Sequence, residues 1–200
     1  MFAVWKFATD LNPYGDGRIF PAGSLRESLR GLSRANAIVL TRMNLVSREK
    51  VDAIKTGLRN MNSDAPIFEL ETHLHKITKL EDFLADRLTP DNDEDRQAVT
   101  SAFVFCGLGN PESFLTMLKE EGFNVVGHRN YGDHKAYRQS DAIDLGSNAQ
   151  DSGARFLLTT AKDAVKLEKI RFDLPVFVVE TTPKINEMDA FVRIITPSYS

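Results

Sequence analysis

The chain has 200 residues, 42% of them hydrophobic, and a formal net charge of -3. This length is sufficient for one substantial core or two small ones, and the charge gives no general reason to expect a nucleic-acid partner. The single cysteine, Cys106, excludes an intramolecular disulfide framework and a multi-cysteine metal site, and no apolar run reaches membrane-spanning length.

The first feature in chain order is a glycine turn followed by a predicted helix start. Gly15-Asp16-Gly17 is typical of a turn and precedes Arg18. Ser24-Leu25-Arg26-Glu27 matches a capping box, which predicts a helix with Leu25, Leu29 and Leu32 on one face. Arg26 then lies near a helix N-terminus, where an anion is favoured. A guanidinium can clamp phosphate oxygens, although either arginine could instead be a surface charge.

A strand, a helix and a second strand follow. The run 37–41 is apolar and β-branched, which predicts a strand. Ser47 is expected to cap a helix whose apolar residues recur at helical spacing, namely Val51, Ile54, Leu58 and Met61. A further apolar run at 66–70 completes one α/β half, residues 1–70.

Residues 71–100 are more polar than the segments before them, and their composition predicts a linker. The alternating segment 72–77 is strand-like, and the acidic run 91–95 is typical of a solvated loop. His73 and His75 would share one face of a strand and could ligate a metal, but no third ligand has suitable spacing. An exposed linker face is the preferred interpretation, and no metal site is predicted.

The second half opens with a buried strand at 102–106 and the turn Gly107-Leu108-Gly109, followed by Asn110 as a cap and Pro111 at the first helical position. A Gly-x-Gly turn before a helix can leave room for a phosphate. The dinucleotide fingerprint, however, requires a glycine where Glu112 stands. An ordinary tight turn is therefore preferred over a nucleotide site.

The helix that Pro111 opens is expected to end near Gly122, and further strands and helices alternate after it. Strands are predicted at 123–126, 156–160 and 176–179, and a helix around 164–167. This order predicts a small Rossmann-like domain over residues 101–200. The fold class is α/β with mainly parallel strands.

Polar residues at strand ends are the candidates for chemistry, because open parallel sheets bind ligands beyond the carboxyl ends of their strands. His134 could orient or share a proton with a carboxylate that activates a hydroxyl. It could also simply cap a helix, which the residues alone favour. Lys162 and Asp163 follow Thr160 at another strand end, where a functional role and a structural one, capping with a surface ion pair, are equally favoured.

Four segments in order carry a family resemblance: 12–27, 107–114, 127–134 and 159–167. Together they resemble the C-terminal part of the lipid A 4'-kinases (tetraacyldisaccharide 4'-kinase). The resemblance implies that residues 1–70 are the residual C-terminal portion of an ATP-binding kinase domain. It implies transfer of the γ-phosphoryl group of ATP, with Mg2+, to the 4'-hydroxyl of a tetraacylated glucosamine disaccharide 1-phosphate, at the cytosolic face of the bacterial inner membrane.

The resemblance also implies roles for individual residues. His134 matches the family's aspartate–histidine pattern, in which the histidine pairs with a catalytic aspartate from the P-loop domain. Arg26 matches a phosphate contact in the Leu-Arg-Glu segment, and Arg18 and Lys162 are expected to bind substrate or phosphate. Ala161 replaces a glutamate of the family segment, so any role of that carboxylate is lost.

The family's ATP-binding P-loop, G-x-x-x-x-G-K-[ST], does not occur in these 200 residues. The family's N-terminal membrane-binding helix, magnesium-binding carboxylates and catalytic aspartate also have no counterpart, so the chain alone is expected not to turn over. One alternative is a non-catalytic remnant or paralogue that binds an acylated sugar or a partner, which the loss of the glutamate at Ala161 supports. Another is an unrelated Rossmann-like enzyme with a nucleotide at 107–109, against which Glu112 argues.

Overall fold

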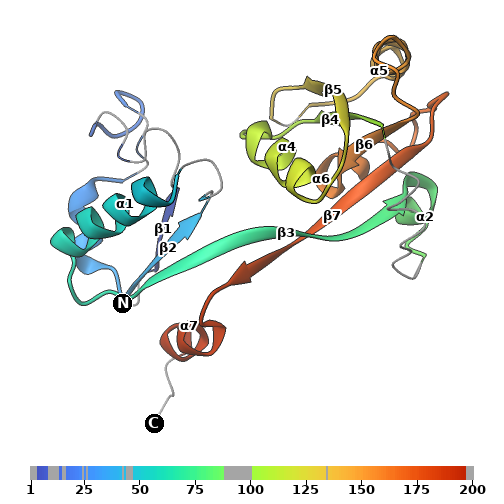
Figure 1. The fold of residues 1–200 in the computed structure, drawn as a ribbon. Helices are drawn as coiled ribbons and strands as arrows, with labels where there is room; N and C mark the ends of the chain where they lie inside the picture. Colours follow the sequence, from blue (N-terminus) through green and yellow to red (C-terminus); the bar gives the residue numbers. More distant parts are fainter. Residues whose placement is uncertain are drawn as a thin grey trace. The chain divides into compact units, whose positions relative to one another are not determined.

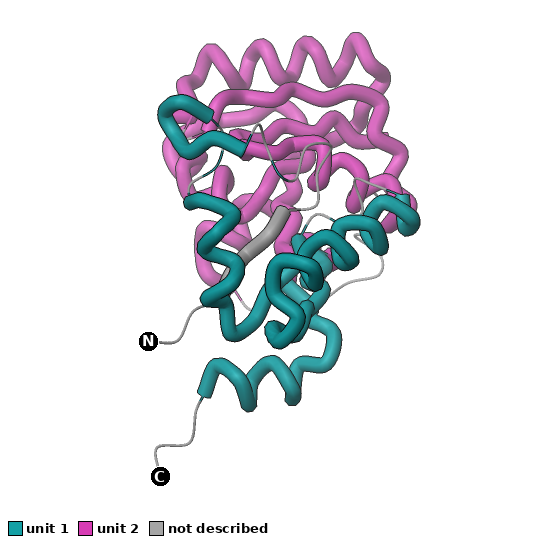
Figure 2. The backbone as a smooth tube through the Cα atoms, turned by 90° about the vertical axis from the view of Figure 1, so that its left-hand side faces the viewer, with its two compact units in different colours: residues 1–72, 183–200 teal, residues 73–182 magenta. Residues whose placement is uncertain are grey.

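The computed structural model describes residues 4–8, 14, 17–23, 25, 27–41, 43, 47–87, 101–133 and 135–196. The chain divides into two compact units: unit 1 comprises residues 1–72 and 183–200, and unit 2 comprises residues 73–182 (Figure 2). Two long strands, β3 (Ile67–Lys79) and β7 (Val176–Ile185), contain residues of both units (Figure 1).

Unit 1 is a small parallel sheet with helices on both faces. Its strands β1 (Val4–Ala8) and β2 (Ala37–Thr41) pair in parallel, and β2 pairs in parallel with the start of β3. The helical elements are η1 (Leu29–Arg34), α1 (Arg48–Met61) and α7 (Met188–Ile195). Ile38 and Leu40 pack in one cluster with α1, whereas Ala37 and Val39 pack with α7. This alternation is the period of two expected for a strand buried on both faces.

Helix α1 confirms the expectation from its sequence. The Ser47 hydroxyl accepts from the Lys50 N–H (3.4 Å), and Val51, Ile54 and Leu58 are buried on one face. Met61, the last apolar residue of the predicted series, is instead 41% exposed at the end of the helix.

The predicted helix start at Ser24 is wrong for the described residues around it. Leu25 forms a β-bridge with Ile19: its N–H donates to the Arg18 carbonyl (3.2 Å), and its carbonyl accepts from Phe20 (2.7 Å). Because these bonds occupy both backbone groups of Leu25, the backbone cannot form a helical turn there. The helical segment, a 3-10 helix, begins later, at Leu29, with Ser28 as its cap.

Unit 2 contains the strand order β7-β6-β4-β5, in which all neighbours are parallel. The strands are β4 (Ala102–Cys106), β5 (Val125–Asn130) and β6 (Phe156–Thr160), and the helices are α2 (Leu80–Leu84), α4 (Pro111–Glu120), α5 (Gln139–Asp151) and α6 (Ala161–Ala164). Strand β3 lies next to β7. The Asn186 N–H, just after β7, donates to the Glu69 carbonyl near the start of β3. The Thr78 hydroxyl near the end of β3 donates to the Glu180 carboxylate. The two strands therefore run in opposite directions.

Helices cover both faces of β4 and β6. Val104 and Leu158 pack in one cluster with α4, whereas Phe105 and Leu157 pack in another with α5 and α6. The chain leaves β4 toward β5 and then crosses to β6 on the other side of β4, which makes a topological switch point between these strands. The predicted α/β class with mainly parallel strands is confirmed.

The boundaries of the two compact units differ from those of the predicted segments 1–70, 71–100 and 101–200. Residues 71–79 of the predicted linker belong to β3, and residues 80–84 form α2. The C-terminal residues 183–200 group with unit 1, because Phe191 and Ile194 of α7 pack with Val39 and Phe68. The acidic run 91–95 lies outside the described residues.

Among the described residues, no helix combines the length and the apolar character needed to cross a bilayer.

Helix α5 provides a matched pair of residues that tests the packing of unit 2. Leu145 is fully buried, whereas Ile143 on the same helix is 62% exposed. Leu145→Ala is expected to lower the free energy of unfolding by about 2–5 kcal/mol, because it removes buried methyl groups and leaves a cavity. Ile143→Ala is expected to change it by no more than about 0.5 kcal/mol. Urea denaturation followed by circular dichroism measures both, and equal effects of the two substitutions would contradict the placement of α5.

Candidate functional site

The candidate site lies at the carboxyl ends of β4 and β6, on either side of the switch point. Gly107 directly follows β4, and Thr160 ends β6. In open parallel sheets this is the position at which ligands bind. Here a side chain of the protein, the carboxylate of Asp163 at the start of α6, occupies part of it.

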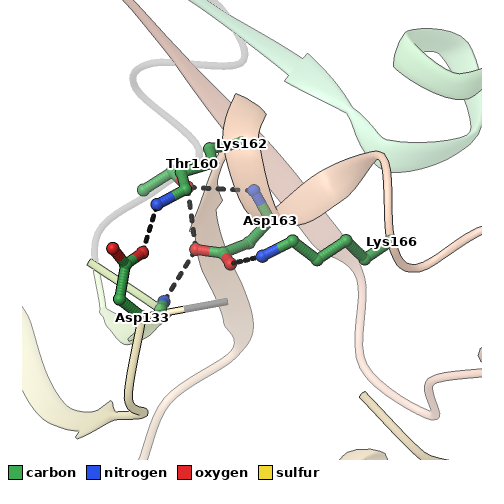
Figure 3. Close-up of polar contacts among 6 residues, drawn as sticks. Asp133, Thr160, Lys162, Asp163 and Lys166 are labelled. Carbon is green, nitrogen blue, oxygen red and sulfur yellow. Dashed lines mark hydrogen bonds and ion pairs between the residues drawn. The ribbon is translucent and has the colours of Figure 1, made fainter. Parts of the chain in front are cut away.

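The Asp163 carboxylate is completely buried and accepts hydrogen bonds from three groups (Figure 3). The Gly107 N–H donates at 2.8 Å, the Thr160 hydroxyl at 2.9 Å and the Lys166 ammonium at 3.0 Å. The Asp163 N–H in turn donates to Thr160 Oγ1 (3.2 Å), so Thr160 is the N-cap of α6. A buried carboxylate needs such donors and a cation, because its transfer from water is otherwise costly.

The close approach at Gly107 explains why glycine stands there. A Cβ at this position would lie 3.0 Å from Asp163 Oδ1 and 3.3 Å from the Gly132 carbonyl oxygen. The Gly107 amide, one of the groups that could bind a phosphate at this turn, is already bonded to a carboxylate. A phosphate at Gly107 would therefore meet buried negative charge, which agrees with the interpretation of the turn as structural.

Residues 131–138, which we call the 131–138 loop, connect β5 to α5 and carry His134 in sequence. The Tyr131 N–H donates to the Cys106 carbonyl (2.8 Å), which fixes the start of the loop to the end of β4. After His134, the Lys135 ammonium pairs with Asp141 at 2.8 Å. The Asp141 carboxylate also accepts from the Arg138 N–H (2.7 Å), where α5 begins. The loop is thus attached to the sheet at one end and to α5 at the other.

The side chain of Tyr137 packs the loop onto the sheet. Its ring makes edge contacts with Phe105 (5.8 Å between centroids) and with Tyr131 (5.4 Å). Burial, followed by the negative charge of Asp163, raises the pKa of the Tyr137 hydroxyl above its ordinary value. The ring contacts of Tyr137 therefore pack the loop against β4, while its hydroxyl is buried.

The structure describes two of the four predicted site residues, Arg18 and Lys162. His134 and Arg26 lie outside the described residues. Arg18 is exposed in unit 1, on the loop that bridges to Leu25. Lys162 belongs to unit 2, is 44% exposed and forms an ion pair with Asp133, the residue before His134 (Figure 3).

Sequence reasoning missed Asp163 as the centre of this network. The Thr160-x-x-Asp163 spacing is a capping pattern and was the available signal. What the pattern could not reveal is that the same carboxylate also binds Gly107, which is 56 positions away in sequence. Among the described residues, no group of three or more His, Cys, Asp or Glu side chains could hold a metal ion, and the candidate pair His73 and His75 gains no third ligand.

The network gives a prediction for stability. Asp163→Asn keeps the side-chain shape but removes the charge that faces Lys166, and is expected to lower the free energy of unfolding by about 1–3 kcal/mol. Asp173→Asn, at an exposed position, is the matched control and should change it by less than about 0.5 kcal/mol. Urea denaturation measures both values. If Asp163→Asn were as mild as the control, the buried network would not have the importance we assign to it.

Cys106 gives a second prediction, for pH dependence. The thiol is fully buried, and burial raises its pKa to about 11. Because only the thiolate reacts, the rate of alkylation of the folded chain should keep rising with pH well beyond about 8.5, the pKa of a free thiol. In urea the rate should level off near that value. Iodoacetamide labelling followed by mass spectrometry distinguishes the two curves, and a plateau near the free-thiol value in the folded chain would contradict the burial of Cys106.

Comparison with known proteins places these features in a family. Residues 8–198 match the family model described as Tetraacyldisaccharide-1-P 4'-kinase. A tetraacyldisaccharide 4'-kinase of Halothermothrix orenii is 33% identical over 179 residues, covering 84% of this chain and 47% of that protein. One of Elusimicrobium minutum is 32% identical over 195 residues, covering 94% and 50%.

A solved structure supports the fold. The "apo" form of LpxK from Aquifex aeolicus in complex with ATP aligns with a TM-score of 0.56 and 20% identity, covering 97% of this chain and 51% of that chain. The chain therefore spans about half the length of the relatives that it matches. Because the family model covers nearly the whole sequence, the chain belongs to the tetraacyldisaccharide-1-P 4'-kinase family.

Proposed function

We propose that this chain supplies the C-terminal half of a lipid A 4'-kinase. The reaction is transfer of the γ-phosphoryl group of ATP to the 4'-hydroxyl of a tetraacylated glucosamine disaccharide 1-phosphate, at the cytosolic face of the inner membrane. The observation that carries the proposal is the family match over residues 8–198. In this proposal residues 1–70 are the end of the ATP-binding domain, and residues from about 101 to 182 form the smaller Rossmann-like domain, because residues 183–200 group with unit 1.

The proposal assigns a role to each predicted site residue. His134 shares a proton with a carboxylate that activates the acceptor hydroxyl, and Arg26 stabilises the charge on the transferred phosphoryl group. Arg18 and Lys162 contact phosphate oxygens of the substrate. Pairing with Asp133 is compatible with such a contact, because a lysine ammonium has three N–H donors.

The residues of this chain do not fit an ATP–magnesium site by themselves. The 200 residues contain no P-loop pattern, and no cluster of metal-ligating side chains exists among the described positions. Since the phosphate cradle and its metal ligands supply most of the charge stabilisation in phosphoryl transfer, a P-loop part must complete the site. The chain alone is therefore expected not to turn over.

A second candidate is a non-catalytic paralogue that binds the acylated sugar. The observation in its favour is Ala161 at the start of α6, where the family segment has a glutamate. This candidate predicts binding of the disaccharide without ATP dependence.

The test is phosphorylation of tetraacyldisaccharide 1-phosphate by the chain, with and without the P-loop half of a matched relative. Product formed only with the added half is the expected result, after sedimentation has shown that the two parts associate. ATP-dependent product from the chain alone would contradict the proposal. Association and substrate binding without product would favour the non-catalytic candidate.

Substitution of a histidine tests the assigned chemistry in the same assay. His134→Ala is expected to lower kcat by about 10²- to 10⁴-fold, the usual contribution of a positioned proton-transfer group. His75→Ala is the matched control, because His75 is exposed on β3 and has no role in the proposal, so its kcat should stay at the wild-type value. Equal activity of the two variants would remove His134 from the mechanism.

A further inference from the structure

We infer that the exposed tip of the loop at residues 18–25 is a membrane-contact site, which inserts apolar side chains into the surface of a bilayer of anionic phospholipids. We call this segment the 18–25 loop, and its tip is Ile19-Phe20-Pro21-Ala22. The proposed function brings the chain to a membrane only through the lipid substrate, whereas this contact is made by the protein itself and does not require catalysis.

The tip of the 18–25 loop exposes four consecutive apolar residues. Phe20 is 75% exposed, more than any other large apolar side chain among the described residues, and Ile19 is 46% exposed. Pro21 and Ala22 are exposed as well. Single apolar residues are common on protein surfaces, but an exposed run of four is not expected unless it has a binding partner.

The backbone of the loop presents this tip in a defined form. The Phe20 N–H donates to the Leu25 carbonyl (2.7 Å), and the Leu25 N–H donates to the Arg18 carbonyl (3.2 Å). The Gly23 N–H donates to the Ile19 carbonyl (3.1 Å). These bonds satisfy polar groups within the loop, which matters at a bilayer because unpaired backbone groups are costly in hydrocarbon.

The loop is attached to the core of unit 1 on either side. Tyr14 before it and Leu29 after it both pack against the cluster that contains Ile54. The Tyr14 hydroxyl also donates to the Ile54 carbonyl (3.4 Å). Gly57 on the same helix leaves room for this contact, since a Cβ there would lie 2.6 Å from the Tyr14 hydroxyl oxygen. The exposed tip is therefore carried by a segment that is itself anchored in unit 1.

The charge around the loop favours an anionic partner. Residues 17–34 contain four arginines, at positions 18, 26, 30 and 34, and one acidic residue, Glu27, although the whole chain has a formal net charge of -3. Arg18, Arg30 and Arg34 are exposed. Basic side chains near an anionic bilayer each strengthen binding, and this attraction adds to the burial of apolar side chains.

The small size of the tip favours a bilayer over a protein as the partner. A specific protein interface buries about 800 Å² on each partner, which four side chains, one of them an alanine, do not supply. A bilayer surface needs no complementary shape, so a short apolar tip with arginines beside it can bind there reversibly.

Flotation of the full chain with lipid vesicles tests the contact without a catalytic assay. The chain is expected to bind vesicles that contain phosphatidylglycerol more tightly than vesicles of phosphatidylcholine alone, and added salt should weaken the binding. Phe20→Ala is expected to lower the partition coefficient by about tenfold, because the ring no longer leaves water. Arg30→Gln should lower it by about fivefold. Phe20→Trp, which keeps an aromatic ring, should keep the binding.

Two variants in unit 2 are the matched controls. Ile143→Ala removes an apolar side chain that is 62% exposed on α5, and Arg155→Gln removes an exposed charge just before β6. Neither should change the partition coefficient. Absence of vesicle binding by the wild-type chain, or equal binding of Phe20→Ala and Ile143→Ala, would overturn the inference.

Two further results distinguish the bilayer from other partners. If the P-loop half covers the tip, Phe20→Ala weakens the association of the two halves in sedimentation and the complex no longer binds vesicles, which overturns the inference. If binding requires tetraacyldisaccharide 1-phosphate in the vesicles, the substrate and not the bilayer is the ligand, which also overturns it. Vesicle binding with no product in the complementation assay would instead overturn the proposed function and leave the contact standing.

Discussion

The buried carboxylate of Asp163 is the constraint on which the rest of unit 2 depends. An ion removed from water needs donors and a counter-charge, and here they come from Gly107, Thr160 and Lys166. These partners belong to the end of β4, the end of β6 and the segment after α6. One side chain therefore holds together the two strand ends that flank the topological switch point, and it sets the position of Lys162 beside the 131–138 loop.

This arrangement occupies the amide that a phosphate could otherwise bind at the end of β4. The Gly107 amide, which in a dinucleotide-binding fold would face a phosphate, is bonded to a carboxylate. The family match over residues 8–198 rules out the interpretation of the chain as an unrelated nucleotide-dependent enzyme, and the bonded Gly107 amide argues against a phosphate at this turn. The end of β4 also holds the start of the 131–138 loop, through the Tyr131 N–H on the Cys106 carbonyl. In sequence this loop carries the histidine to which the proposed function assigns proton transfer.

The sequence predicted the elements whose signals are local. The buried runs at 37–41, 102–106 and 156–160 are strands, Ser47 caps α1, and Pro111 opens α4. Helix α5 was not predicted, because its buried face consists largely of small residues, Ala142, Gly146 and Ala149 around Leu145, which do not stand out as an apolar pattern. The capping box at Ser24 gave a wrong helix start, because the β-bridge between Leu25 and Ile19 overrides the local preference for a helix. Long-range contacts, such as Asp163 with Gly107, leave no periodic trace in the sequence.

The measurement that tests the central claim most directly is a ¹⁵N-resolved NMR titration of the chain with magnesium ATP, following the Gly107 amide. If Asp163 occupies the anion position at the switch point, the Gly107 resonance should stay in place at millimolar nucleotide, because its N–H is already bonded to a buried carboxylate. A saturable shift of that resonance would contradict the account, since it would mean that nucleotide displaces the carboxylate and that unit 2 is itself a nucleotide-binding domain.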